Sequence, residues 1–173
     1  MKGMVFTEFV EFVENRYGFD AVDGMIEDSG LSGVYTQAGN YPFEEMVTLV
    51  VALCEKQKVE LVEVLEKYGE YLFGKLASLY PNINKFSSVF DIVSHVDNII
   101  HPEVRKLYPD ADLPSFRVVT QTENKLIMEY MSNKSLQHLA KGLILGVAQY
   151  YNENIVVNIQ EDSNPILLEI IKS

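Results

Sequence analysis

The sequence contains no tryptophan, a single cysteine and no apolar run close to the ~20 residues of a membrane-spanning helix. Cys54 alone excludes an intrachain disulfide and fits a reducing compartment such as the cytoplasm. Without a CxxC pair or a Cys/His cluster, a structural zinc site is not expected. The opening residues MKGMVFTEFVEF carry glutamates within the apolar stretch, which argues against a signal peptide. We therefore expect a cytoplasmic protein that does not associate with membranes.

Positive charge is also scarce. The chain has 14 lysines and arginines against 25 aspartates and glutamates, and its net charge is −11. A nucleic-acid-binding surface requires the opposite sign, so no nucleic-acid partner is expected. The acidic residues lie mostly in predicted helices, which is typical of solvated helix faces. An acidic surface that docks a basic partner protein is the alternative.

Hydrolytic chemistry finds no support among the motifs. The sequence has no GxSxG, no phosphate-binding glycine loop and no HExxH. No nucleophile has a base near it in the sequence. The pattern therefore does not predict a hydrolase.

Hydrophobic periodicity divides the chain into a helical first part and a mixed second part. Apolar residues at helical spacing predict helices over residues 4–15, 20–28, 43–56, 60–79 and 86–107. The apolar period then changes to two, which predicts strand pairs 115–120 with 125–131 and 154–160 with 165–171, separated by a helix over 134–151. This order predicts an α+β fold with a mainly antiparallel sheet.

Glycines and a proline inside these helices need a physical reason. Gly69 and Gly74 each cost ~1 kcal/mol relative to alanine, so we expect another element or a flat ligand to approach them closely. Gly142 and Gly146 allow close packing along the later helix. Pro102 lacks an amide hydrogen, which predicts a kink or a restart of its helix.

Two stretches carry candidate chemistry. His101 ends an apolar helix, although a lone helical histidine is more often a packed residue than a metal ligand. Tyr130 and Ser132 share a strand face, and Ser132 or Asn133 is the predicted N-cap of the following helix. With Lys134 they offer hydroxyls, free amides and a cation, which suit a carboxylate or phosphate. Ordinary capping is the alternative interpretation.

Together these residues resemble the haem-nitric oxide/oxygen binding (H-NOX) family, which is related to the haem domain of soluble guanylate cyclase. The resemblance covers the full length. It rests on the MKG opening, on His101 followed by Leu107-Tyr108-Pro109 and Pro114, and on a Tyr-x-Ser-x-Arg motif that reads Tyr130, Ser132, Lys134. It implies one domain over residues 1–173. A helical lobe of about residues 1–62 would pack on a lobe of about 63–173 with a four-stranded antiparallel sheet, and haem would lie between them.

The resemblance implies a role for each matching residue. His101 would be the proximal ligand to the iron of haem b, and Pro114 would press on the porphyrin and distort it. Tyr130 and Ser132 would donate hydrogen bonds to the haem propionates. Lys134 stands where the family has arginine, and it offers one mobile charge in place of a planar fork.

The resemblance also implies which gas binds. Family members that bind O2 have a distal tyrosine at the position that matches Leu139. The other expected distal residues are apolar as well, namely Val5, Phe9, Leu72, Phe73 and Leu143. Without a hydrogen-bond donor, such a pocket favours NO and CO over O2. Entry of Tyr68 or Tyr71 into the pocket is the alternative.

The implied function is that of a haem-based gas sensor without catalytic residues. NO would weaken the iron–His101 bond and so signal to a separate histidine kinase or cyclic-di-GMP enzyme. The tail after residue 153 has no Cys or His, so the zinc site of some family members is not expected. Two other functions stay open, a haem enzyme that turns over peroxide or NO, and a haem-free acidic interaction module.

Overall fold

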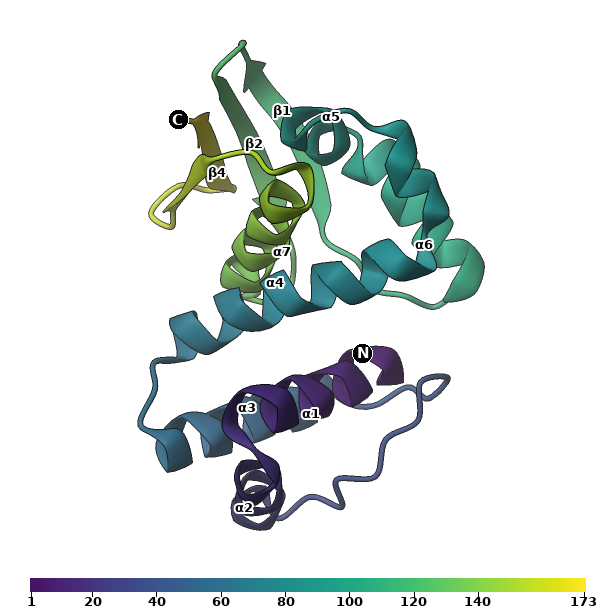
Figure 1. Cartoon of the computed structure of the whole chain (residues 1–173), viewed down its shortest axis with the longest axis vertical. Helices are drawn as coiled ribbons and strands as arrows, with labels where there is room; N and C mark the ends of the chain where they lie inside the picture. The colour runs from purple at the N-terminus through teal and green to yellow at the C-terminus, as the bar shows by residue number, and fades with distance from the viewer. The chain divides into compact units, whose positions relative to one another are not determined.

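The computed structural model describes residues 1–173, apart from the side chain of Pro81. The chain forms two compact units, Met1–Tyr68 and Gly69–Ser173, which we call the helical unit and the sheet unit. Among the described residues, no helix is both long and apolar enough to cross a membrane. The helical unit contains α1 (Gly3–Tyr17), α2 (Phe19–Ser29), α3 (Phe43–Gln57) and the first part of α4 (Leu61–Leu79) (Figure 1).

Aromatic residues at helical spacing form the core of the helical unit. Phe6, Phe9 and Phe12 lie on one side of α1 and are at most 4% exposed. The ring of Tyr68, from α4, packs with its centroid 5.1 Å from that of Phe9. Each such side chain contributes roughly 1.5–3 kcal/mol of burial. Gly18, with φ of 88°, ends α1 and lets the chain turn directly into α2.

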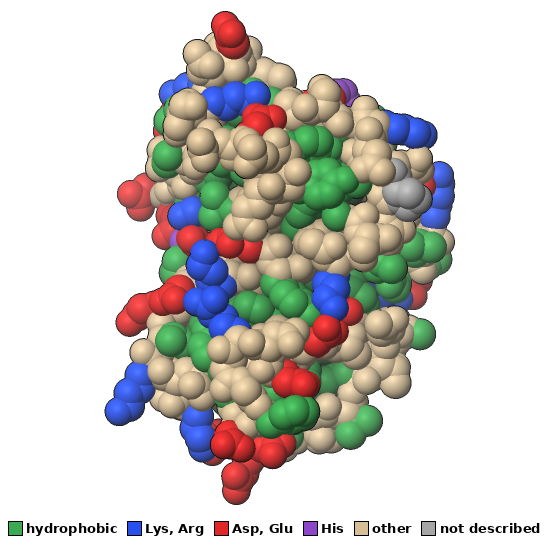
Figure 2. Space-filling view, viewed as in Figure 1, with side chains coloured by type: hydrophobic (Ala, Val, Ile, Leu, Met, Phe, Trp, Pro, Cys, Tyr) green, Lys and Arg blue, Asp and Glu red, His purple; other side chains and the backbone are tan. Residues whose placement is uncertain are grey.

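The exposed side of α2 is strongly acidic. Asp20, Asp23, Glu27 and Asp28 are all exposed, and Figure 2 shows acidic side chains gathered over this part of the chain. The ammonium of Lys56 lies 3.2 Å from the carboxylate of Asp28. These residues form a solvated helix face.

The sheet unit contains the rest of α4 and nine further elements. In chain order they are η1 (Pro81–Lys85), α5 (Val89–Ser94), the π-helical turn η2 (Val96–Ile100), α6 (His101–Leu107), β1 (Ser115–Gln121), β2 (Lys125–Met131), α7 (Gln137–Tyr151), β3 (Ile155–Gln160) and β4 (Ile166–Lys172). The strands form one antiparallel sheet in the order β1-β2-β4-β3. This confirms the predicted α+β fold with a four-stranded sheet.

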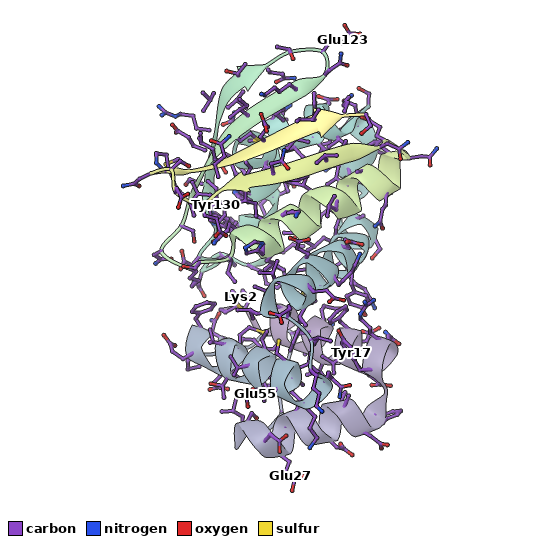
Figure 3. The ribbon with its side chains drawn as sticks, turned by 90° about the vertical axis from the view of Figure 1, so that its left-hand side faces the viewer. Lys2, Tyr17, Glu27, Glu55, Glu123 and Tyr130 are labelled. Atoms are coloured by element: carbon purple, nitrogen blue, oxygen red, sulfur yellow. The ribbon has the colours of Figure 1, made fainter. Side chains whose placement is uncertain are left out.

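The predicted period of two is visible in β2. Leu126, Met128 and Tyr130 point to one face and are at most 4% exposed. They join the core that α5 and α7 form with this face of the sheet. Figure 3 shows the tip of the β1–β2 hairpin, marked by Glu123, at the end of the hairpin away from Tyr130.

Glycines allow α4 and α7 to pack at backbone distance within the sheet unit. A Cβ atom on Gly69 would lie 2.5 Å from the carbonyl oxygen of Leu139. One on Gly146 would lie 2.7 Å from the Cβ atom of Phe73. The expected close approach is therefore confirmed at Gly69. At Gly74 no other part of the chain lies within 4 Å of the added atom, so no element of the protein makes that approach there.

This contrast yields a stability prediction. Gly69→Ala is expected to destabilise the protein by roughly 1–3 kcal/mol, because the new methyl group meets the backbone of α7. Gly74→Ala is the matched control and should stabilise the same helix by up to ~1 kcal/mol. Chemical denaturation followed by circular dichroism measures both variants. Equal stability of the two would contradict the close packing of α4 on α7.

The predicted helix over residues 86–107 is divided into three parts. α6 restarts at His101, so the predicted restart is confirmed, and Pro102 lies in the first turn, where its missing amide breaks no bond of that helix. The π-helical turn η2 was not predicted. In it the amides of Ile99 and Ile100 both donate to the carbonyl of His95, at 2.9 and 3.4 Å.

Candidate functional site

His101 is a buried imidazole with one side already engaged. It is the first residue of α6 and only 8% exposed. Its Nδ1 lies 2.9 Å from Oδ1 of Asp97. Burial lowers the pKa of His101, and the Asp97 carboxylate opposes that shift without cancelling it. Among the described residues, none bonds to Nε2, so a neutral ring presents one lone pair for a ligand.

A row of rings connects this imidazole to the predicted propionate motif. The ring of Phe116 lies 5.9 Å from that of His101 and 5.5 Å from that of Tyr130, measured between centroids. Pro114 is half-buried, two residues before Phe116. The structure thus places His101, Pro114 and Tyr130 in one neighbourhood of the sheet unit.

The segment from Tyr130 to Lys134 folds into a compact turn where β2 ends, and Figure 3 labels Tyr130 there. The Tyr130 hydroxyl donates to the carbonyl of Lys134 at 3.4 Å, and the Lys134 amide donates to Oγ of Ser132 at 3.0 Å. Burial raises the pKa of Tyr130. The predicted N-cap at Ser132 or Asn133 is wrong. α7 starts later, with Leu136 at its N-cap, because the Ser132 hydroxyl is used within the turn.

Lys134 also holds the loop that precedes β1. Its ammonium forms an ion pair with Asp112, two residues before Pro114. This contact lowers the pKa of Asp112 through the hydrogen bond and the charge of Lys134. The lysine side chain is 16% exposed. An ammonium has three hydrogens, so it can donate to a second carboxylate while it keeps the first.

The predicted distal residues of the sheet unit lie where α4 packs on α7. Leu72 and Phe73 are buried on α4, and Leu139 and Leu143 are half-buried on α7. The Phe73 ring lies in the core of this unit, 6.0 Å from that of Tyr150. None of the four side chains carries a hydrogen-bond donor.

The remaining predicted distal residues lie together in the helical unit. Val5 and Phe9 are one helical turn apart on α1. The hydroxyl of Tyr68 donates to the carbonyl oxygen of Val5 at 2.6 Å, which uses the only proton of the phenol. Tyr71 lies on the part of α4 that belongs to the sheet unit, where the ammonium of Lys75 is 5.3 Å from the centroid of its half-buried ring.

The donor set fits a porphyrin-bound metal better than a bare ion. Among the described residues, no three His, Cys, Asp or Glu side chains gather into a metal site. His101 offers a single nitrogen, so a metal here must bring its other ligands with it, as haem iron does. Phe116 provides an apolar neighbour, and Tyr130, Ser132 and Lys134 provide donors for carboxylates. The residues present therefore fit haem.

Comparison with protein-family models matches residues 2–159 to the haem-NO-binding family. The chain belongs to this family, the H-NOX proteins. Comparison with curated protein sequences gives no match. As an H-NOX protein it belongs to a family of haem-based gas sensors, which confirms the resemblance seen in the sequence.

Solved H-NOX structures cover the whole chain. The unliganded Fe(II) protein of K. algicida is 34% identical with a TM-score of 0.93, and the alignment covers 100% of this chain and 97% of that one. The Shewanella woodyi protein in the Fe(II)CO state, bound to IWP-051, is 33% identical with a TM-score of 0.85, over 100% and 95%. The S. oneidensis protein in the Fe(II)NO state is 25% identical with a TM-score of 0.90, over 100% and 99%.

Sequence reasoning missed two carboxylates of this candidate site. Asp97 faces Nδ1 of His101, and Asp112 pairs with Lys134. Asp97 had a usable signal, because it lies four residues before a histidine in a predicted helix, where side chains are neighbours. Asp112 had none, because it lies in a loop whose path the sequence does not specify.

Proposed function

We propose that this protein binds haem b through His101 and senses NO, with CO as a second ligand and O2 excluded. The buried His101 imidazole carries the proposal, because Asp97 engages Nδ1 and Nε2 remains for the iron. When bound, haem supplies a ferrous iron with one coordination position open to a gas. Family membership and the S. oneidensis and S. woodyi structures with NO and CO support these ligands.

The neighbouring residues would hold the cofactor. Ser132 and Lys134 present a hydroxyl and an ammonium to the propionates, and Lys134 keeps its contact with Asp112. Tyr130 would exchange its long bond of 3.4 Å to the carbonyl of Lys134 for one to a propionate. Pro114 would bear on the porphyrin from the loop that this ion pair holds.

The selection of NO and CO over O2 would follow from the absence of hydrogen-bond donors among the distal residues. The expected distal residues are Val5, Phe9, Leu72, Phe73, Leu139 and Leu143, all of them apolar. Bound O2 carries partial negative charge and needs a hydrogen-bond donor, whereas NO and CO need much less. Tyr68 supports this selectivity, because its proton is donated to the backbone of Val5.

Signalling would follow from the loss of the iron–His101 bond when NO binds. His101 begins α6, so its release from the iron would free the start of this helix. A partner protein could recognise this two-state change. We propose a separate histidine kinase or cyclic-di-GMP enzyme as that partner. The protein itself would be cytoplasmic and not an enzyme.

The absorption spectrum of the purified ferrous protein tests cofactor, ligand and selectivity together. We expect a coloured protein whose Soret band shifts to the position of five-coordinate haem when NO is added. CO should shift the band to a six-coordinate position, and air should cause no stable shift other than oxidation.

Each other outcome rejects a defined part of the proposal. A colourless protein that cannot be reconstituted with haem would favour an interaction module. A stable change in air would reject the exclusion of O2. Steady-state consumption of peroxide or NO would favour a haem enzyme.

A further inference from the structure

Asp97 lies between the predicted iron ligand and the first strand of the sheet. Its Oδ1 is 2.9 Å from Nδ1 of His101, and its Oδ2 accepts a hydrogen bond of 2.8 Å from the amide of Phe116. Oδ1 is buried and has no hydrogen-bond donor among the described residues, so its contact with Nδ1 of His101 is an ion-pair distance and not an aligned hydrogen bond. The two oxygens of one carboxylate thus face α6 and β1.

The π-helical turn η2 holds Asp97 in this place. Asp97 is the second residue of η2, and the amide of His101 donates to the carbonyl of Val96 across the wider turn. Single π turns within α-helices occur frequently at functional sites. Here the turn ends at the residue that would bind the iron.

The chemistry of imidazole gives this contact a consequence. A ring nitrogen that binds a metal must present a lone pair, so the other nitrogen must carry the proton. A carboxylate that faces Nδ1 favours the proton there and makes Nε2 a stronger donor to the metal. The carboxylate cannot turn freely, because Phe116 holds its second oxygen.

We propose that Asp97 is a positioning residue for His101: it sets the tautomer and the basicity of the iron ligand and attaches that ligand to β1. The inference rests on the proposed function, because it assumes that His101 binds haem. Asp97 would therefore influence how strongly the iron–histidine bond resists NO.

The chain provides a matched control. Asp91 also precedes a histidine by four residues, and its Oδ1 lies 3.6 Å from Nδ1 of His95. The His95 side chain is 45% exposed, and His95 is not a predicted ligand. Asp97→Asn and Asp91→Asn therefore make the same chemical change at a predicted and at an unrelated imidazole.

Resonance Raman spectroscopy of the ferrous unliganded protein measures the iron–histidine stretch directly. We expect Asp97→Asn to lower its frequency and to raise the rate of haem loss by about tenfold or more, as is usual when a metal-binding histidine loses its carboxylate partner. Asp91→Asn should match wild type in both. An unchanged frequency in Asp97→Asn, with a normal stretch in wild type, overturns the inference and leaves haem binding by His101 intact. Absence of the stretch in wild type overturns both.

A second measurement needs no variant. In the diamagnetic ferrous CO form, the Nδ1–H proton of His101 should give an NMR signal that exchanges slowly with water. Rapid exchange of this proton would show that Asp97 does not hold it and would overturn the inference even if Asp97→Asn failed to fold.

Discussion

His101→Gly is expected to purify without haem and to regain it when free imidazole is supplied. Glycine removes the imidazole that would bind the iron, and free imidazole can fill the space that the side chain leaves. The iron–His101 bond would be the coordinate bond that attaches the cofactor, so haem content should fall to near zero without imidazole. Haem content per protein, from the pyridine haemochrome assay, is the readout.

The control replaces a histidine outside the site. His138 lies on the first turn of α7, and its Nε2 is 2.8 Å from the carboxylate of Glu161. His138→Gly makes an equal change in volume and helix propensity and should keep its haem. Unchanged haem content in His101→Gly without imidazole would reject the ligand assignment.

If the protein excludes O2 as proposed, Leu139→Tyr is expected to bind O2 in air. The phenol would add a donor at the position where O2-binding family members have tyrosine. A hydrogen bond of ~1–3 kcal/mol to the bound gas corresponds to O2 dissociation that is slower by roughly tenfold to a hundredfold. Flash photolysis or stopped-flow mixing with O2 measures this rate.

Two further variants show whether the hydroxyl of the new tyrosine, and no other change, is responsible for O2 binding. Leu139→Phe adds the same ring without a donor and should still exclude O2. Tyr68→Phe should leave O2 exclusion unchanged, because the Tyr68 proton is already donated to Val5, although the lost bond should cost ~1 kcal/mol of stability. Exclusion of O2 by Leu139→Tyr in a folded, haem-loaded protein would place residue 139 outside the distal pocket.

Most of the fold could be predicted from the sequence, because the apolar residues of its core recur at helical spacing or at every second position. Phe6, Phe9 and Phe12 mark the buried side of α1, and the alternation in β2 marks the covered face of the sheet. The π-helical turn was not readable. A π-helical turn has one more residue between its hydrogen-bonded groups than an α-helical turn. The spacing of apolar residues in Val96–Ile100 does not distinguish the two.

The candidate site could be predicted where a polar side chain stands out at the end of a helix or a strand. His101 and Tyr130 stand out as an imidazole at a helix start and a hydroxyl at a strand end. The turn after Tyr130 was misread, because a serine hydroxyl accepts equally well from a helix amide or from a local turn, as Ser132 does. Partners such as Asp97 depend on which side chains meet in space.

The bond from the Phe116 amide to Asp97 also has an entropic consequence. It joins residues 19 positions apart and so closes the stretch that contains α6 and the two prolines after it. Closing such a stretch loses chain entropy once, when the protein folds. A cofactor that arrives later meets a proximal segment already ordered, so little of its binding free energy is spent on arranging the chain. The carboxylate that orients one imidazole therefore also preorganises the segment around it.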